Sequence, residues 1–185
     1  YECIHYSFFS PSDLDLLRLP QEAPERNAIP ILNPINEELS LMRTTLAASM
    51  LNAIARNQKK GNLEGRLFEM GNVFVPEELP LNSYPDERDT LCIGIFGERE
   101  SFFTLKGLAE KTAETLFLDF SYEPVKKPFL HPYQAAAVFC QGKKVGYLGK
   151  AAYEVCEKLD LRTGAYILEM DLKALYAMRE RAASF

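Results

Sequence analysis

The feature that most constrains the fold is a helical pattern in residues 33–62, NPINEELSLMRTTLAASMLNAIARNQKKGN. Proline suits the first turn of a helix and glycine suits its end, and Pro34 and Gly61 stand at these places. We expect a helix over 38–57, with a start anywhere from residue 38 to Thr45. Its apolar side chains recur every four residues, which predicts one broad buried face. These side chains are Met42, Leu46, Met50 and Ile54.

Extended segments lie on both sides of this helix. Residues 2–9 are rich in aromatic and β-branched types and predict a first strand. Residues 66–76 predict a second strand. The nearly continuous apolar run 90–97 predicts a strand at the centre of a sheet. Two further apolar runs flank Gly142, which is typical of a compact hairpin.

Helices and strands alternate irregularly in the rest of the chain. Short helices are expected in 10–19 and 150–161, and a longer one over 101–118. Gly107 within the longer helix predicts the close approach of a neighbouring element. A last strand in 164–175 is expected to lead into a helix. The predicted fold class is α+β, an antiparallel sheet with helices packed against it.

Length and charge limit the function. We expect residues 1–185 to form one domain, because 185 residues with 47% hydrophobic content can bury a sizeable core. The net charge of −5 and the shortness of the basic patches argue against strong nucleic-acid binding by this segment. No apolar run reaches the roughly 18 residues that a membrane span needs. The absence of an initiator methionine suggests a piece of a longer protein.

The four cysteines indicate a compartment rather than a site. Cys3, Cys92, Cys140 and Cys156 are widely separated, with no C-x-x-C pair. A zinc site needs closely spaced ligands, so no metal is expected. We expect the cysteines to be buried small apolar residues in a reducing compartment, which indicates the cytoplasm.

The strand GRLFEMGNVF, residues 65–74, carries one arginine and one carboxylate, Arg66 and Glu69. This pair has two interpretations. It is either a clamp for a phosphate or carboxyl group, or a structural ion pair on a sheet. Arg43 has a similar ambiguity: it binds a phosphate or a partner, or it forms a salt bridge with a nearby glutamate. His131 next to Pro132 is expected to shape the entry to a strand rather than to act as a general base.

Several pieces of the chain, in order, carry a resemblance. They are NPINEELSLMRTTLAASMLNAIARN, RLFEMGNVF, FFTLKGLAEKTAETL, LHPYQAAAVFCQGKKVGYLG and LEMDLKAL. Together they resemble the catalytic-like domain of the beta subunit of bacterial phenylalanyl-tRNA synthetase, from about residue 6 to residue 175. The resemblance implies an antiparallel sheet of the class II aminoacyl-tRNA synthetase type. It also implies that editing and anticodon-binding domains of the longer beta chain are absent here.

The resemblance implies a role in an assembly. In this family the alpha subunit carries the working site, which uses ATP and magnesium, and the complex contains two alpha and two beta chains. The expected partners are therefore the alpha subunit, a second beta chain and, at the level of the complex, tRNA(Phe). The helix over 38–57 and the first strand are the expected interface. No cofactor is expected in this segment itself.

The resemblance also answers the question about Arg66. Class II synthetases use an arginine two residues before a glutamate of this strand to hold the ATP α-phosphate. Here that position holds Leu67, and Arg66 points to the other face because strand side chains alternate. Glu69 is then left to accept hydrogen bonds within the sheet. The glycine-rich strand and arginine of the third class II motif are also missing from YILEMDLKAL, so the fold is expected without the chemistry.

Three functions stay open at this point. The first is a non-catalytic structural module, in which Arg43, Arg66, Met42, Leu46 and Met50 serve structure or an interface. The second is a free-standing relative that binds an amino acid or an adenylate as a sensor. The third is direct RNA contact through paired lysines, against which the acidic net charge argues.

Overall fold

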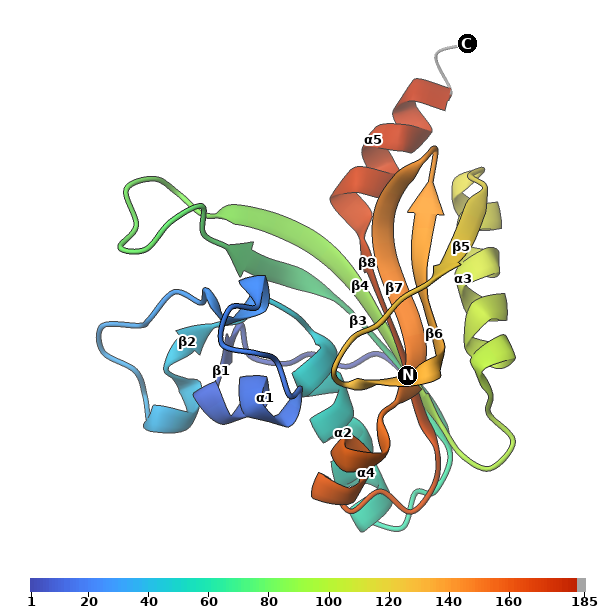
Figure 1. Cartoon of the computed structure of the whole chain (residues 1–185), viewed down its shortest axis with the longest axis horizontal. Coiled ribbons are helices and arrows are strands. Elements are labelled where there is room, and N and C mark those ends of the chain that lie inside the picture. Colours follow the sequence, from blue (N-terminus) through green and yellow to red (C-terminus); the bar gives the residue numbers. More distant parts are fainter. Residues whose placement is uncertain (183–185) are drawn as a thin grey trace.

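A computed structural model describes residues 1–182. Its centre is a six-stranded sheet in which every neighbouring pair of strands is antiparallel (Figure 1). From one edge to the other, the strands are β3 (Gly65–Val75), β4 (Asp86–Phe96), β8 (Ala165–Asp171), β7 (Lys143–Ala151), β6 (Leu130–Cys140) and β5 (Phe120–Pro124). This confirms the predicted fold class.

Helices cover both faces of the sheet. Helix α2 (Ala47–Lys59) packs on one face against β4 and β8. Helices α3 (Phe102–Leu116) and α5 (Leu172–Ala182) pack on the other face. Adjacent residues of β4 therefore belong to different cores: Cys92 is buried beneath α2, and Leu91 is buried beneath α3 and α5. The continuous apolar run in this strand follows from burial on both faces.

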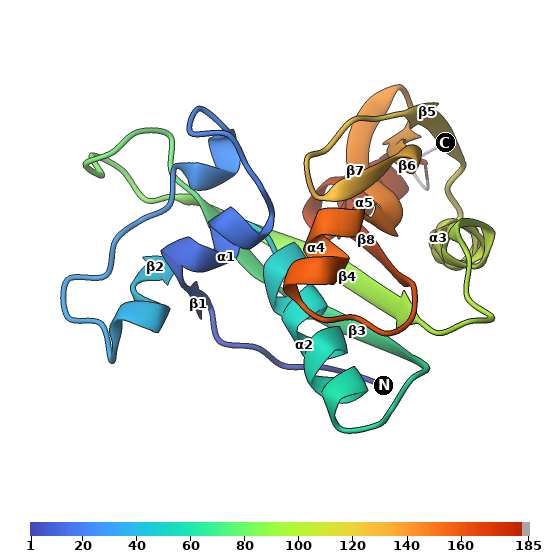
Figure 2. The ribbon, with the colours of Figure 1, turned by 60° about the horizontal axis from the view of Figure 1, so that its bottom comes forward.

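A smaller group of elements stands at one end of the molecule (Figure 2). Strands β1 (Phe8–Phe9) and β2 (Leu41–Met42) pair there, next to α1 (Pro11–Leu16). The predicted first helix is confirmed, and Ser10 caps it: its hydroxyl accepts from the N–H of Ser12, and its own N–H donates to Asp13. The remaining short helices are η1 (Pro24–Arg26), η2 (Glu37–Leu39) and α4 (Tyr153–Lys158).

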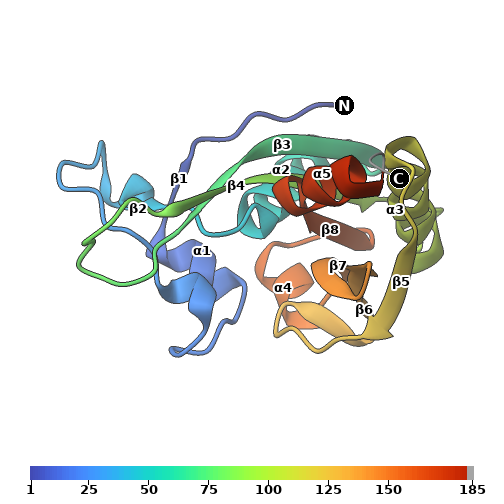
Figure 3. The same ribbon diagram turned by 90° about the horizontal axis from the view of Figure 1, so that it is seen from above.

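The expected first strand over 2–9 is mostly wrong. Only Phe8–Phe9 forms a strand, because β2 is short and offers no longer partner. The preceding residues instead run beside the outer edge of β3 (Figure 3). There the N–H of Cys3 donates to the carbonyl of Phe68 over 2.7 Å, and the N–H of Phe68 donates to the carbonyl of Tyr1 over 2.9 Å. This segment covers part of an edge that would otherwise expose unpaired backbone groups.

The long helix is shorter than its apolar pattern indicated. Helix α2 begins at Ala47, so Met42 lies in β2 and Leu46 is the residue before the first turn. Two tertiary contacts set this boundary. Met42 pairs with Phe8 in the small sheet, and the side chain of Glu169 from β8 accepts the N–H of Leu46 over 2.8 Å. A carboxylate at the start of a helix satisfies a free N–H and is favoured by the helix dipole.

Two other expectations need correction. Gly107 is exposed on α3, and a Cβ atom built there meets nothing within 4 Å, so it marks no close approach. The close approach occurs at Gly94 of β4, where an added Cβ would lie 2.6 Å from Cγ of Met50. Cys92 and Cys140 are buried as expected, whereas Cys3 and Cys156 are only partly buried, and none forms a disulfide. The hairpin around Gly142 is confirmed as β6 and β7.

Candidate functional site

Strand β3 places its two conspicuous charges on opposite faces. Arg66 lies on the outer, exposed side, and its Nε donates to Oε1 of Glu100 over 2.7 Å. Leu67 faces the core beneath α2 and is 7% exposed. Glu69 is on the same face as Leu67 and is also buried. Arg66 and Glu69 therefore do not form the pair that their closeness in sequence allowed.

Glu69 is paired instead with Arg43, which enters from the segment before α2. Nη1 of Arg43 donates to Oε1 of Glu69 over 2.8 Å, and both side chains are 3% exposed. Nδ1 of His5 lies 2.5 Å from Oε2 of the same carboxylate. Burial alone would raise the pKa of Glu69, but the hydrogen bond from His5 and the charge of Arg43 outweigh it and lower that pKa. Arg43 therefore forms a salt bridge with a nearby glutamate, which is the second of the two interpretations of this residue.

A row of side chains crosses the sheet from Glu69. Antiparallel pairing sets Glu69 beside Cys92, Cys92 beside Glu169, and Glu169 beside Tyr147. Residues paired in this way share a face, so all four lie on the α2 side. The row leads from the buried cluster around Glu69 to a cavity above β8 and β7.

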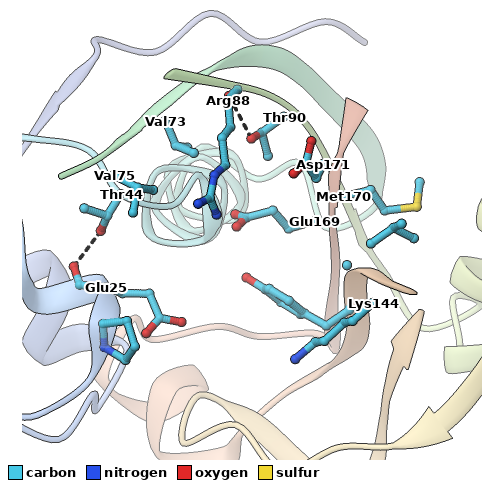
Figure 4. A pocket seen from close by; sticks show the side chains of 14 residues that line it. Glu25, Thr44, Val73, Val75, Arg88, Thr90, Lys144, Glu169, Met170 and Asp171 are labelled. Atoms are coloured by element: carbon cyan, nitrogen blue, oxygen red, sulfur yellow. Dashed lines mark hydrogen bonds between the residues drawn. The ribbon is translucent and has the colours of Figure 1, made fainter. Parts of the chain in front are cut away.

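This cavity has a volume of about 300 Å³. Its floor includes Glu169 and Tyr147, and Thr44 and Glu25 close it from the N-terminal part of the chain. In Figure 4 the charged ends of Glu25, Arg88 and Glu169 face this cavity from different elements. Val73 and Val75 of β3 supply apolar walls of this cavity.

Glu169 is the central carboxylate of the cavity. Its Oε2 atom accepts the hydroxyl of Thr45 over 2.7 Å and the N–H of Leu46 over 2.8 Å. Burial raises the pKa of Glu169, although the two hydrogen bonds act in the opposite direction. No described residue donates a hydrogen bond to its other oxygen, Oε1.

A second carboxylate of the cavity, Glu25, forms an ion pair with Lys127. Nζ of Lys127 lies 3.0 Å from Oε1 of Glu25, and the same ammonium lies 4.6 Å from the ring centre of Tyr147. Burial would raise the pKa of Glu25, but the charge and hydrogen bond of Lys127 lower it. Tyr147 is 7% exposed, and its hydroxyl has no hydrogen-bond partner among the described residues. Burial raises the pKa of that hydroxyl well above its usual range, although a side-chain contact with Thr45 acts in the opposite direction.

The sequence model of the family described as "Phenylalanyl tRNA synthetase beta chain CLM domain" matches residues 1–172. The chain belongs to this family. Two curated relatives are beta subunits of phenylalanine–tRNA ligase. That of Clostridium tetani is 37% identical over 177 residues, and that of Clostridium acetobutylicum is 36% identical over 176 residues.

The CLM domain is a small part of these relatives. The alignment covers 95% of this chain and 22% of the Clostridium tetani protein, and 94% and 22% in the Clostridium acetobutylicum comparison. A solved structure, the pyrrolysyl-tRNA synthetase of Desulfitobacterium hafniense, superposes with a TM-score of 0.74 over 97% of this chain and 63% of that one. At 15% identity this likeness concerns the fold, which is of the class II synthetase type.

The residues predicted from sequence lie in the CLM domain at four separate places. Arg43 and Glu69 meet in the buried cluster, and Arg66 is at the surface. Met42 is half-buried in β2. Leu46 and Met50 are 0% exposed, within the chain's own core.

The cavity of the CLM domain was not found from sequence. Glu169 had one available signal, since it is the charged residue inside the apolar run AYILEM. Glu25 and Lys127 had none, because 102 positions separate them.

The described residues contain no group of three or more histidine, cysteine or acidic side chains placed to hold a metal ion. No helix in the described part is long and apolar enough to cross a membrane.

Proposed function

We propose that this chain is a non-catalytic structural module of a phenylalanine–tRNA ligase beta subunit. It associates with the alpha subunit in the cytoplasm, in a complex of two alpha and two beta chains, and so supports the ATP-dependent attachment of phenylalanine to tRNA(Phe). Membership of the CLM family and the similarity to about a fifth of a beta subunit, 22% of the Clostridium tetani protein, support this role. The observation that carries the non-catalytic part is the environment of Leu67 and Glu69.

The face around Leu67 does not fit ATP. A phosphate-binding site on this strand needs a fixed cation, and Leu67 supplies only a buried apolar side chain. Glu69 is not available as a partner for a ligand, because Arg43 and His5 already occupy its two oxygens. On this proposal, the alpha subunit binds ATP and magnesium, and no catalytic step is assigned to this domain.

The N-terminal segment is the surface that we propose for the alpha subunit. Helix α2, the other expected interface element, is mostly buried by its own chain. Ile4 and Tyr6 are 89% and 70% exposed, although both are large and apolar or aromatic. Large exposed apolar side chains in one segment are typical of a protein interface.

An association experiment tests this surface. The chain is co-expressed with the alpha subunit, and complex formation is measured by size-exclusion chromatography with light scattering. The double variant Ile4→Asp with Tyr6→Ser is expected to weaken the complex by about tenfold or more, because interface anchors typically cost over 1 kcal/mol each. Tyr84→Ser is the matched control, since Tyr84 is 99% exposed in the loop between β3 and β4. Unchanged association of the double variant would contradict the proposed surface.

An activity experiment tests the missing chemistry. Amino-acid-dependent exchange of pyrophosphate into ATP is measured for the chain alone and for the chain mixed with the alpha subunit. No exchange is expected from the chain alone, because Leu67 offers no charge to the α-phosphate. Exchange by the chain alone that disappears in Glu69→Gln would overturn the non-catalytic assignment.

A further inference from the structure

The N-terminal segment, residues 1–7, is held to the sheet mainly by polar contacts. Cys3 and His5 are partly buried, whereas Ile4 and Tyr6 are 89% and 70% exposed. Apolar stabilisation scales with the area removed from water, so the two exposed side chains contribute little to the attachment of this segment. The contacts that position it therefore come from its backbone and from its partly buried residues.

Glu69 holds the middle of this segment through both of its oxygens. Nδ1 of His5 lies 2.5 Å from Oε2, and the backbone N–H of His5 donates to Oε1 over 3.3 Å. The His5 side chain is 13% exposed, and the Glu69 side chain is 3% exposed. Hydrogen bonds to a charged group are the strong ones, and a site with little water strengthens them further. His5 is therefore the side chain that ties the middle of the segment to β3.

Arg43 fixes the part of the segment that follows His5. Its Nη1 donates to the carbonyl of Tyr6 over 3.3 Å, and its backbone N–H donates to the carbonyl of Ser7 over 2.9 Å. The same Nη1 donates to Oε1 of Glu69 over 2.8 Å. Glu69 and Arg43 thus form one polar anchor for three consecutive residues of the segment.

We infer that the contact between His5 and Glu69 is a latch that preorganises the N-terminal segment for binding a partner protein. While the contact is made, Ile4 and Tyr6 are held outward. Once it is broken, the middle of the segment opens and has to be ordered again when the partner binds. A competent state that is only partly populated weakens the apparent affinity by that fraction. This inference rests on the proposed association with the alpha subunit and makes His5 a positioning residue for that surface.

Amide hydrogen exchange of the chain alone, measured by NMR, tests the latch. The reporters are the backbone N–H groups of residue 5 and of Arg43, which donate to Glu69 and to Ser7. His5→Asp sets a second carboxylate beside Glu69, so their protection factors are expected to fall at least about tenfold. His5→Gln keeps a side-chain N–H donor and is expected to stay within about threefold of the native values. Unchanged protection in His5→Asp would overturn the inference.

Protection in β6 and β7 reports the whole fold and is expected to be the same in all of these chains. If His5→Asp lowers it as well, His5→Ala, which removes the ring without adding a charge, takes its place under the same criteria.

Calorimetric titration with the alpha subunit tests the consequence for binding. His5→Asp is expected to weaken association at least about fivefold, and His5→Gln is expected to stay within about twofold of the native chain. Tyr84→Asp is the matched control, because it adds a carboxylate at a residue that is 99% exposed in the loop between β3 and β4. An open segment that binds with native affinity would overturn the inference. No association by the native chain would instead refute the proposed function, and a latch found by exchange would then have no role in this assembly.

Discussion

Arg43 and Glu69 form a buried ion pair in which Nη1 and Oε1 lie 2.8 Å apart and each side chain is 3% exposed. Arg43 also donates to the carbonyl of Asn72 through its Nε over 2.8 Å. The Arg43 side chain therefore connects the segment before α2 to two positions of β3, Glu69 and Asn72. Both oxygens of the Glu69 carboxylate are therefore engaged within the fold.

Removing one partner of this pair should be costly. Arg43→Met leaves Glu69 buried with only His5 to compensate its charge, and a buried charge left without its partner typically costs about 3 to 5 kcal/mol. The free energy of unfolding from urea titration measures the loss. Arg66→Met is the control, because its partly exposed pair with Glu100 should contribute about 1 kcal/mol or less. Equal losses in the two variants would contradict a special role for the Arg43 pair.

Acid should weaken the fold partly through Glu69. Its pKa in the folded chain is below the ordinary value, so its stabilising contribution is present above the unfolded pKa of about 4.3 and is lost as the pH falls through the folded pKa. Glu69→Gln removes this titration. The free energy of unfolding of the native chain should therefore decline more steeply than that of Glu69→Gln as the pH falls below about 4.3. Urea midpoints across this range measure the difference, and parallel curves would refute the prediction.

Glu169 should have the opposite effect. Its pKa in the folded chain is above the ordinary value. Between the unfolded pKa of about 4.3 and the folded pKa, the folded chain therefore binds more protons than the unfolded chain, and the free energy of unfolding falls as the pH rises through this range. Glu169→Gln keeps an oxygen that can accept from Thr45 and Leu46. The stability of Glu169→Gln relative to the native chain should therefore increase as the pH rises above about 4.3. Thermal melting at a series of pH values measures this trend, and a trend of the reverse sign would show that the assigned direction is wrong.

Two glycines should respond differently to alanine. Gly94→Ala would push Cβ to 2.6 Å from Cγ of Met50, which is fully buried, and such overpacking typically costs about 1 to 3 kcal/mol. Gly107→Ala is the matched control in the exposed part of α3, where nothing lies within 4 Å of the new Cβ. It should instead stabilise the chain by about 0.5 to 1 kcal/mol through helix propensity.

A double variant tests the cause of the Gly94 effect. If the contact with Met50 is responsible, Gly94→Ala combined with Met50→Ala should cost less than the sum of the two single changes, because the two sites share one volume. Urea denaturation of all four chains gives this coupling. Strict additivity would mean that the contact with Met50 does not cause the loss.

The kinds and order of most elements could be predicted from local patterns in the sequence. Alternation in 66–76, the apolar run 90–97 and the helical period before Gly61 are local properties, and each survives in the structure. The alternation of side chains along a strand also predicted correctly that Arg66 lies on the opposite face of β3 from Leu67 and Glu69, because this alternation follows from backbone geometry alone.

The ends of the elements and the pairing of the charges depend on tertiary contacts. The start of α2 depends on Glu169, which lies 123 positions from Leu46, and the pairing of Glu25 with Lys127 spans 102 positions. Arg43 had several glutamates within reach, and the register of β3 selected Glu69. Such choices depend on the packing of distant strands and on the desolvation of the groups they bring together, and neither quantity is encoded in a local pattern.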